Sequence, residues 1–267
     1  MKEPLPPRDV QQSKDLKNAP VAVFDSGVGG ISVLREMKRL LPHENFIYFG
    51  DARNTPYGEK ESTTLRALIF GHAASLLARA KALVLACNTA TAVAVKALRA
   101  AYPNVPIIGM EPAVKPALAV GNHPRILILA TETTLREKKL KALLARYNSH
   151  ATFLPLAAPE LVRLIEAGKT DSPDLDAYLA ALLAPFSGNP PDAIVLGCTH
   201  FPLAASAISR VFSDTVPLFH GAEGTAKELK RRLTSANLLN EQIHLGTVTL
   251  TASDSAALPR YLSLFSK

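Results

Sequence analysis

The sequence predicts an α/β protein with two similar domains, each with a mostly parallel sheet flanked by helices. Eight short apolar runs end in polar or glycine-containing turns, and helix-like segments such as 62–80 and 135–147 separate them. Short, continuous apolar runs are typical of parallel strands that are buried on both faces. The last four runs follow the first four at a nearly constant distance of about 105 to 111 positions, so we interpret the chain as a duplicated unit.

The predicted strands of the two halves correspond one to one. The first four are VAVFDSG (21–27), NFIYFGDA (45–52), ALVLACNT (82–89) and VPIIGMEP (105–112). Their counterparts are RILILATE (125–132), ATFLPLAA (151–158), AIVLGCTH (193–200) and TVPLFHGAE (215–223). Ligands of parallel sheets bind outside the carboxyl ends of the strands, where all these turns lie. We therefore expect the two halves to face each other across a ligand cleft.

The ends of the chain complete this organisation. Residues 1–20 are rich in proline and charge, and we expect an arm that precedes the first core strand. The tail begins with the helical TAKELKRRL and is expected to return to the first half. The predicted domains are therefore 21–115 with 224–267, and 116–223.

Composition favours a cytoplasmic enzyme. The 267 residues are 48% hydrophobic, and the formal net charge is +7. Neither a signal-peptide apolar region nor a run of ~18 apolar residues is present, so we expect no membrane association. The basic residues are scattered over helix-like segments without a recognisable nucleic-acid module, so we do not expect nucleic acid as a partner.

The only two cysteines, Cys87 and Cys198, lie in equivalent turns of the two halves. In a reducing compartment they are not expected to form a disulfide, and two cysteines alone cannot complete a structural zinc site. A helix N-terminus favours thiolate over thiol, and both turns precede helix-like segments. One such cysteine would be interpreted as a small buried apolar residue. Two in matching turns, each followed by polar groups, favour thiol chemistry.

The turn after the first strand, DSGVGG, supplies Asp25, Ser26 and flexible glycines. Glycines that precede a helix let backbone N–H groups approach an anion closely. The turn is not a dinucleotide fingerprint, because Ser32 occupies the position of the third glycine. The alternative is a tight turn capped by Asp25.

Other polar residues follow the remaining strand ends. Tyr57 and Gly58 belong to GDARNTPYG, a segment full of turn formers. The two cysteines are followed by Asn88, Thr89, Thr199 and His200, which can each simply cap a helix or pack in the core. They also match the donors and acceptors that a zwitterionic substrate requires.

Taken together, VFDSGVGGISV, GDARNTPYG, CNTAT, GMEP and GCTHFPL resemble the motif series of the cofactor-independent glutamate racemases, within the aspartate/glutamate racemase superfamily. The motifs recur in the same order from residue 21 to about 224. The resemblance implies two similar α/β domains with the active site between them. It also implies that the enzyme supplies D-glutamate for peptidoglycan, and hence for cell wall biogenesis and cell shape, with no pyridoxal phosphate and no metal.

The resemblance also implies residue roles. Cys87 and Cys198 would be the two acid/base residues, with Cys87 deprotonating D-glutamate and Cys198 deprotonating L-glutamate, assisted by Asp25 and His200. The substrate contacts would be Asp25, Ser26, Tyr57, Gly58, Asn88, Thr89, Thr199 and His200. Glu166 in LVRLIEAG would support the histidine. The run LFHGAEG departs from the family, which commonly has an aspartate turn where this chain has His220 and Gly221.

The chemistry agrees with this resemblance. Inversion at an α-carbon removes a proton on one face and returns one on the other, which two thiols can do directly. No lysine lies at an equivalent strand end to form a Schiff base with pyridoxal phosphate. We expect a homodimer and, as in some family members, regulation by an anionic cell-wall precursor. The alternatives are an aspartate racemase or related isomerase of the superfamily, and a non-catalytic amino-acid-binding or thiol redox protein.

Overall fold

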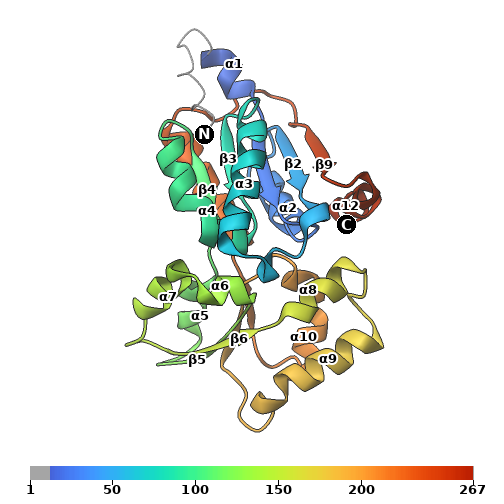
Figure 1. Ribbon diagram of the computed structural model, residues 1–267. Coiled ribbons are helices and arrows are strands. Elements are labelled where there is room, and N and C mark those ends of the chain that lie inside the picture. The colour runs from blue at the N-terminus through green and yellow to red at the C-terminus, as the bar shows by residue number, and fades with distance from the viewer. Residues whose placement is uncertain (1–12, 267) are drawn as a thin grey trace.

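The computed structural model describes residues 13–266, which form two parallel sheets covered by helices (Figure 1). The first sheet has the strand order β4-β3-β1-β2-β9. Its strands are β1 (Val21–Asp25), β2 (Phe46–Gly50), β3 (Ala82–Leu85), β4 (Ile107–Gly109) and β9 (Val248–Ala252). The second sheet, of order β6-β5-β7-β8, consists of β5 (Arg125–Ala130), β6 (Thr152–Ala157), β7 (Ala193–Leu196) and β8 (Leu218–His220).

The strand orders agree with duplication. All strand pairs are parallel, and β8-β7-β5-β6 repeats the order β4-β3-β1-β2. The predicted α/β class with two parallel sheets is confirmed.

Helices connect the strands and cover both sheets. The α-helices of the first half are α1 (Ser13–Asn18), α2 (Ile31–Leu40), α3 (Ser62–Leu77) and α4 (Asn88–Ala101). Those that follow are α5 (Val114–Ala117), α6 (Glu132–Arg136), α7 (Lys138–Ala145), α8 (Pro159–Glu166), α9 (Pro173–Leu183), α10 (Ala205–Val211), α11 (Ala222–Ser235) and α12 (Leu258–Phe265). Short 3₁₀ helices are η2 (Ala52–Asn54), η3 (Tyr57–Glu59), η4 (Leu118–Val120), η5 (Ala184–Phe186), η6 (Phe201–Ala204) and η7 (Ser255–Ala257).

Local sequence explains these elements. The central strands β1, β3 and β7 are buried throughout and apolar except for Asp25 at the end of β1, as expected for strands with helices on both faces. In α2, the buried residues Ile31, Leu34 and Met37 repeat at helical spacing, and basic residues occupy the last turn, where the helix dipole favours cations.

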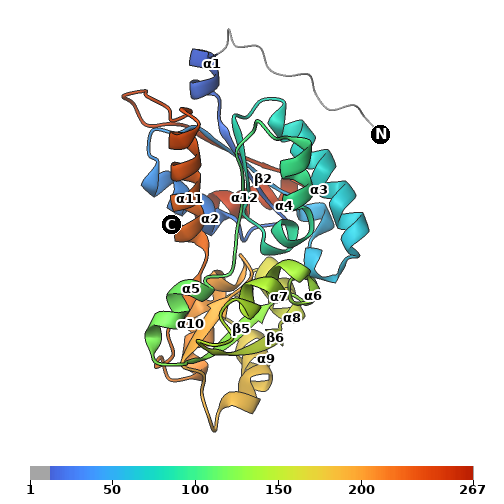
Figure 2. The same ribbon diagram turned by 90° about the vertical axis from the view of Figure 1, so that its left-hand side faces the viewer.

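The chain returns to the first sheet after β8. Figure 2 shows α11 beside α2, and β9 pairs in parallel with β2. The domain boundaries at 115–116 and 223–224 stay a prediction.

Two expected segments differ in detail. The helix expected over 135–147 is divided, because Glu137 has extended backbone angles between α6 and α7. Within the predicted arm, residues 13–18 form α1, and the Lys17 carbonyl accepts a hydrogen bond from the buried Lys81 Nζ. Residues 1–12 of the arm lie outside the described part.

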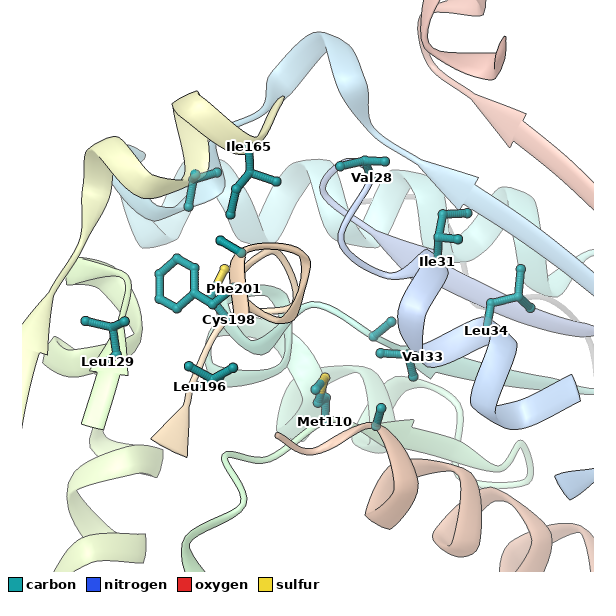
Figure 3. Packing of buried hydrophobic residues seen from close by; sticks show 14 of the residues in the cluster. Val28, Ile31, Val33, Leu34, Met110, Leu129, Ile165, Leu196, Cys198 and Phe201 are labelled. Atoms are coloured by element: carbon teal, nitrogen blue, oxygen red, sulfur yellow. The ribbon is translucent and has the colours of Figure 1, made fainter. Parts of the chain in front are cut away.

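One hydrophobic cluster extends through both halves and underlies the cleft. It joins Val28 and Met110 of the first half to Ile165 and Phe201 of the second, with Cys198 among its members (Figure 3). The inner ends of the two halves therefore pack on each other. Over residues 13–266, no helix is long and apolar enough to span a membrane.

Candidate active site

Cys87 lies at the carboxyl end of β3 and is the N-cap residue of α4. Its sulfur accepts a hydrogen bond from Ala90 N at 3.4 Å and lies 3.7 Å from Ser26 Oγ, to which it donates. The side chain is buried beside the turn that follows β1. The first cysteine and Ser26 are therefore in contact, as their positions at neighbouring strand ends predict.

The thiolate expected for Cys87 is not found in this state of the site. Burial and, to a smaller extent, the charge of Asp25 raise the pKa of the Cys87 thiol to about 12. The Ala90 N–H and the Ser26 hydroxyl favour the thiolate, but burial outweighs them. Cys87 is consequently a thiol at neutral pH, which corrects the prediction from helix position alone.

Cys198 lies in the turn after β7, and its sulfur is 3.6 Å from His200 Nδ1. The helix that follows is the four-residue η6, not a long α-helix, and α10 begins only at Ala205. Among the described contacts, the principal partner of this buried sulfur is therefore an imidazole. Figure 3 shows Cys198 beside Phe201 on this turn.

His200 is held on its other side by Glu166, the last residue of α8. The two are 2.5 Å apart, His200 Nε2 to Glu166 Oε1, and the same oxygen accepts Val28 N–H at 3.0 Å. Burial disfavours the imidazolium, but Cys198 and Glu166 outweigh it and raise the pKa of His200 well above its usual value. Burial likewise disfavours the Glu166 carboxylate, yet His200 and Val28 N–H lower its pKa. At neutral pH the pair is imidazolium and carboxylate.

Asp25 links the two halves. Its carboxylate accepts hydrogen bonds from Gly27 N and from Thr199 Oγ1, both at 2.9 Å. Burial raises the pKa of this carboxyl, while His200 and the two hydrogen bonds lower it. The hydrogen bond from Thr199 to Asp25 thus joins the turn that carries Cys198 to the turn after β1.

The glycines after Asp25 permit close approach of the two halves. A Cβ on Gly27 would lie 2.0 Å from Glu166 Oε1, and one on Gly29 would lie 2.7 Å from the backbone of Thr199 and His200. The glycine requirement here comes from contact with the second half, in addition to any anion binding.

Gly58 lines a hollow together with Thr133 of the other half, and the buried Tyr57 precedes it. The Tyr57 hydroxyl donates to Asp51 Oδ2 at 2.6 Å, and the buried Asp51 also contacts His72. The Gly58 carbonyl accepts Thr133 Oγ1 at 2.8 Å, and a Cβ on Gly58 would lie 2.6 Å from Thr131 Cβ. Tyr57 is therefore fixed by its own half, whereas Gly58 contacts the other half.

Thr89 reveals a group of residues that sequence reasoning missed. Its hydroxyl lies 3.0 Å from Thr131 Oγ1 and 3.2 Å from Thr134 Oγ1, and these two are 2.9 Å apart. All three are buried. The duplication could have identified Thr131 as a site residue, because it directly follows β5 as Ser26 directly follows β1.

Asn88 is buried with neither its side-chain oxygen nor its nitrogen hydrogen-bonded. It lines a hollow together with Thr91, Met110, Thr134 and Lys139. A buried amide normally has partners. The Asn88 amide can thus bind a polar group of a ligand.

The His220 and Gly221 departure lies beside Met110 and Glu111, which line the same hollow as Asn88. His220 ends β8 and is exposed, and a Cβ on Gly221 would lie 2.3 Å from the Glu111 carbonyl. No cluster of three or more residues able to hold a metal is present within 13–266. The structure brings together the two cysteines' turns, Asp25, His200, Glu166 and the threonines without His220.

Comparison with known proteins gives a consistent answer. The family model Asp/Glu/Hydantoin racemase matches residues 31–229. A glutamate racemase of Clostridium botulinum is 42% identical over 243 residues, covering 91% of this chain and 94% of that protein.

Two solved structures are also similar. The glutamate racemase isoform RacE1 of Bacillus anthracis has a TM-score of 0.83 at 29% identity and covers 92% of this chain and 95% of its own. The Escherichia coli glutamate racemase, solved with L-glutamate and the activator UDP-MurNAc-Ala, has a TM-score of 0.77 at 31% identity, covering 91% of this chain and 95% of its own.

Proposed function

We propose, from the premise that this chain belongs to the Asp/Glu/hydantoin racemase family and is a glutamate racemase, that Cys87 and Cys198 exchange the α-proton of glutamate on opposite faces. The observation that carries this two-base proposal is the placement of the thiols. Both are buried, each follows a central strand of its own sheet, and the charge of Cys198 is among the causes that raise the pKa of Cys87.

The protonation pattern supports opposite roles for the two sulfurs. The Cys87 thiol, with its raised pKa, is ready to donate a proton. Cys198 lies beside a His200 imidazolium, which stabilises a thiolate, so Cys198 acts as the base. In the forward step the Cys198 thiolate takes the α-proton of L-glutamate, and Cys87 delivers its proton to the opposite face. The product state then has a Cys87 thiolate, which starts the reverse reaction from D-glutamate.

The remaining polar groups suit a zwitterion with a second carboxylate. Asp25 can accept from the ammonium group, while the Asn88 amide and the hydroxyls of Thr89, Thr131 and Thr134 can donate to carboxylates. Preorganised donors are worth roughly 3 to 4 kcal/mol each where charge develops in a dry site. Ser26, Tyr57, Gly58 and Thr199 complete the lining. The mechanism uses no cofactor and no metal, because the thiols carry both proton transfers.

The experiment is incubation of the purified protein with L-glutamate in D₂O without added cofactor. Optical rotation and the Cα proton signal are followed together by NMR. We expect loss of the proton signal and decay of rotation to zero. Persistence of both signals with a folded, reduced protein would contradict the proposal. The same assay with aspartate tests selectivity, since that lies in the contacts to the side-chain carboxylate.

The cellular role follows as part of the proposal. D-glutamate made in the cytoplasm would enter peptidoglycan synthesis, and an anionic cell-wall precursor would regulate the enzyme, as UDP-MurNAc-Ala activates the E. coli protein. Titrating such a precursor into the racemisation assay tests the regulation. A homodimer stays a prediction that light scattering measures.

A further inference from the structure

The C-terminal helix reaches the second half through Arg260. Its guanidinium donates from Nη1 to the Glu166 carbonyl and from Nη2 to the Ile165 carbonyl. The helix α12 itself packs on α2 and β9, and Tyr261 is buried with its ring edge-on to Tyr48 of β2, at a centroid distance of 5.6 Å. Figure 1 shows α12 above α8. Arg260 therefore connects the first sheet to the end of α8.

The carbonyls that Arg260 contacts belong to the last turn of α8. Such carbonyls have no partner within a helix, and a cation is favoured beside them. Because one planar guanidinium contacts two successive carbonyls, it fixes the orientation of this backbone as well as its position. The Glu166 side chain extends from this part of the backbone.

The Glu166 side chain transmits that position to Cys198. Glu166 Oε1 contacts His200 Nε2 at 2.5 Å, and His200 Nδ1 faces Cys198 Sγ at 3.6 Å. The oxygen lies only 2.0 Å from the position that a Cβ on Gly27 would take, so Glu166 is closely packed against this turn. The charge of Arg260 also lowers the pKa of Glu166, in the direction that favours the carboxylate.

The connection to the other sulfur is less direct, because Glu166 Oε1 meets the Ser26 turn only through its hydrogen bond from Val28 N–H. Cys87 is held by Ser26 and by the Ala90 N–H of its own half. Cys87 therefore has no described contact with α8 or α12.

We propose that Arg260 is a positioning residue for the Cys198 half of the reaction, acting from the C-terminal helix through Glu166 and His200. This inference rests on the proposed two-thiol mechanism. It assigns the C-terminal helix a part in catalysis that is selective for one of the two sulfurs. Since Arg260 and α8 come from different halves, their contact also makes the correct setting of Cys198 dependent on closure of the halves.

The kinetic test compares wild type with Arg260→Gln. Arg231→Gln on α11 is the matched control, because the described partner of the Arg231 side chain is Glu228 on the same helix. For Arg260→Gln, kcat/KM should fall about tenfold. The fall must be the same in both directions, because the ratio of the two kcat/KM values equals the equilibrium constant, which is one for two enantiomers. The primary deuterium isotope effect on kcat/KM should rise for the enantiomer whose α-proton Cys198 removes and fall for the other. The control should match wild type.

A merely structural role would slow the enzyme without separating the two isotope effects, and that result, or wild-type kinetics, would overturn the proposal. Arg260→Lys should be intermediate, because one ammonium cannot reproduce the two-carbonyl contact. If Arg260→Gln does not fold, this variant carries the test, with the same asymmetry at a smaller loss.

A spectroscopic readout separates this inference from the proposed function. The imidazole proton between His200 and Glu166 should appear far downfield in the ¹H NMR spectrum and be assigned by its loss in Glu166→Gln. It should broaden or move upfield in Arg260→Gln and stay unchanged in Arg231→Gln. An inactive wild type would refute the racemase mechanism alone, whereas an unchanged resonance in Arg260→Gln would refute the role of Arg260.

Discussion

The two cysteines occupy equivalent turns but have different surroundings. Cys87 has a hydroxyl and a backbone amide as partners, whereas Cys198 has an imidazole that a carboxylate keeps protonated. Burial dominates at Cys87, whereas Cys198 faces the charged pair of His200 and Glu166. In the proposed mechanism this difference suits donation at Cys87 and abstraction at Cys198.

Replacing either cysteine by serine should abolish racemisation in both directions, by at least about a hundredfold, because each sulfur is needed once in every turnover. Serine is nearly isosteric, so the fold should be retained. Polarimetry from both enantiomers, with circular dichroism as the folding control, measures this. Near-normal racemisation by either single variant would show that the two-base assignment is wrong.

Glu166→Gln should move the alkaline limit of activity to lower pH. The folded pKa of His200 lies above its usual value, so the imidazolium is present at neutral pH and is lost only as the pH rises through that raised value. A neutral amide no longer favours the imidazolium, so the pKa of His200 falls.

The pH profile of kcat/KM measures this shift. The matched control is Glu160→Gln, an exposed carboxylate on the same helix, which pairs with Arg163. An identical alkaline limit in wild type and Glu166→Gln would exclude His200 protonation as its cause.

At the scale of elements, the turns after the strands decide how closely the halves meet. The DSGVGG turn approaches Glu166 and the backbone at Thr199 so closely that a side chain at Gly27 or Gly29 would collide. The same turn provides Asp25 and Ser26 to the site. One turn therefore both supplies side chains to the site and allows the two halves to approach closely.

Gly27→Ala should lower kcat/KM by roughly tenfold to a hundredfold, because its Cβ displaces Glu166 from His200 and small displacements of catalytic groups are costly. Steady-state kinetics measure the loss. Gly71→Ala in α3 is the control, since a Cβ there meets nothing within 4 Å and alanine favours helix by about 1 kcal/mol. Equal activity of both variants would contradict the close contact at Gly27.

At the scale of the molecule, the chain termini support the first sheet. The C-terminal tail adds β9 beside β2. Near the N-terminus, the Lys17 carbonyl of α1 accepts a hydrogen bond from buried Lys81, which also pairs with Glu44. The C-terminal tail also acts on the site through Arg260, whereas α1 has no described contact with either cysteine. Loss of α1 should therefore change stability more than catalysis.

Deleting residues 2–19 should lower the free energy of unfolding by about 1 to 3 kcal/mol, because buried Lys81 Nζ loses the Lys17 carbonyl as an acceptor. Urea unfolding measures this, and kcat at 25 °C should stay unchanged. Deleting residues 2–12 alone keeps α1 and is the control. Equal unfolding midpoints of the two deletions would show that α1 contributes nothing.

The sequence by itself determined the strands, their duplication, the two cysteines and the motif series, because apolar periodicity and strand-end turns are local properties. Strand ends predicted a cleft between the two halves, and the family resemblance implied that Asp25, Ser26, Thr199 and His200 would gather there. Only the tertiary structure decided which groups touch. Helix position suggested a thiolate at Cys87, but burial, which depends on packing of the whole fold, makes it a thiol.

The tertiary structure also brought in Thr131, Thr134 and Arg260. The threonines meet Thr89 across the two halves, and Arg260 reaches α8 from a helix more than ninety residues later in the chain. Contacts between segments so far apart depend on how two complete sheets dock. A single sequence shows which side chains are present, but it does not show which of them come into contact.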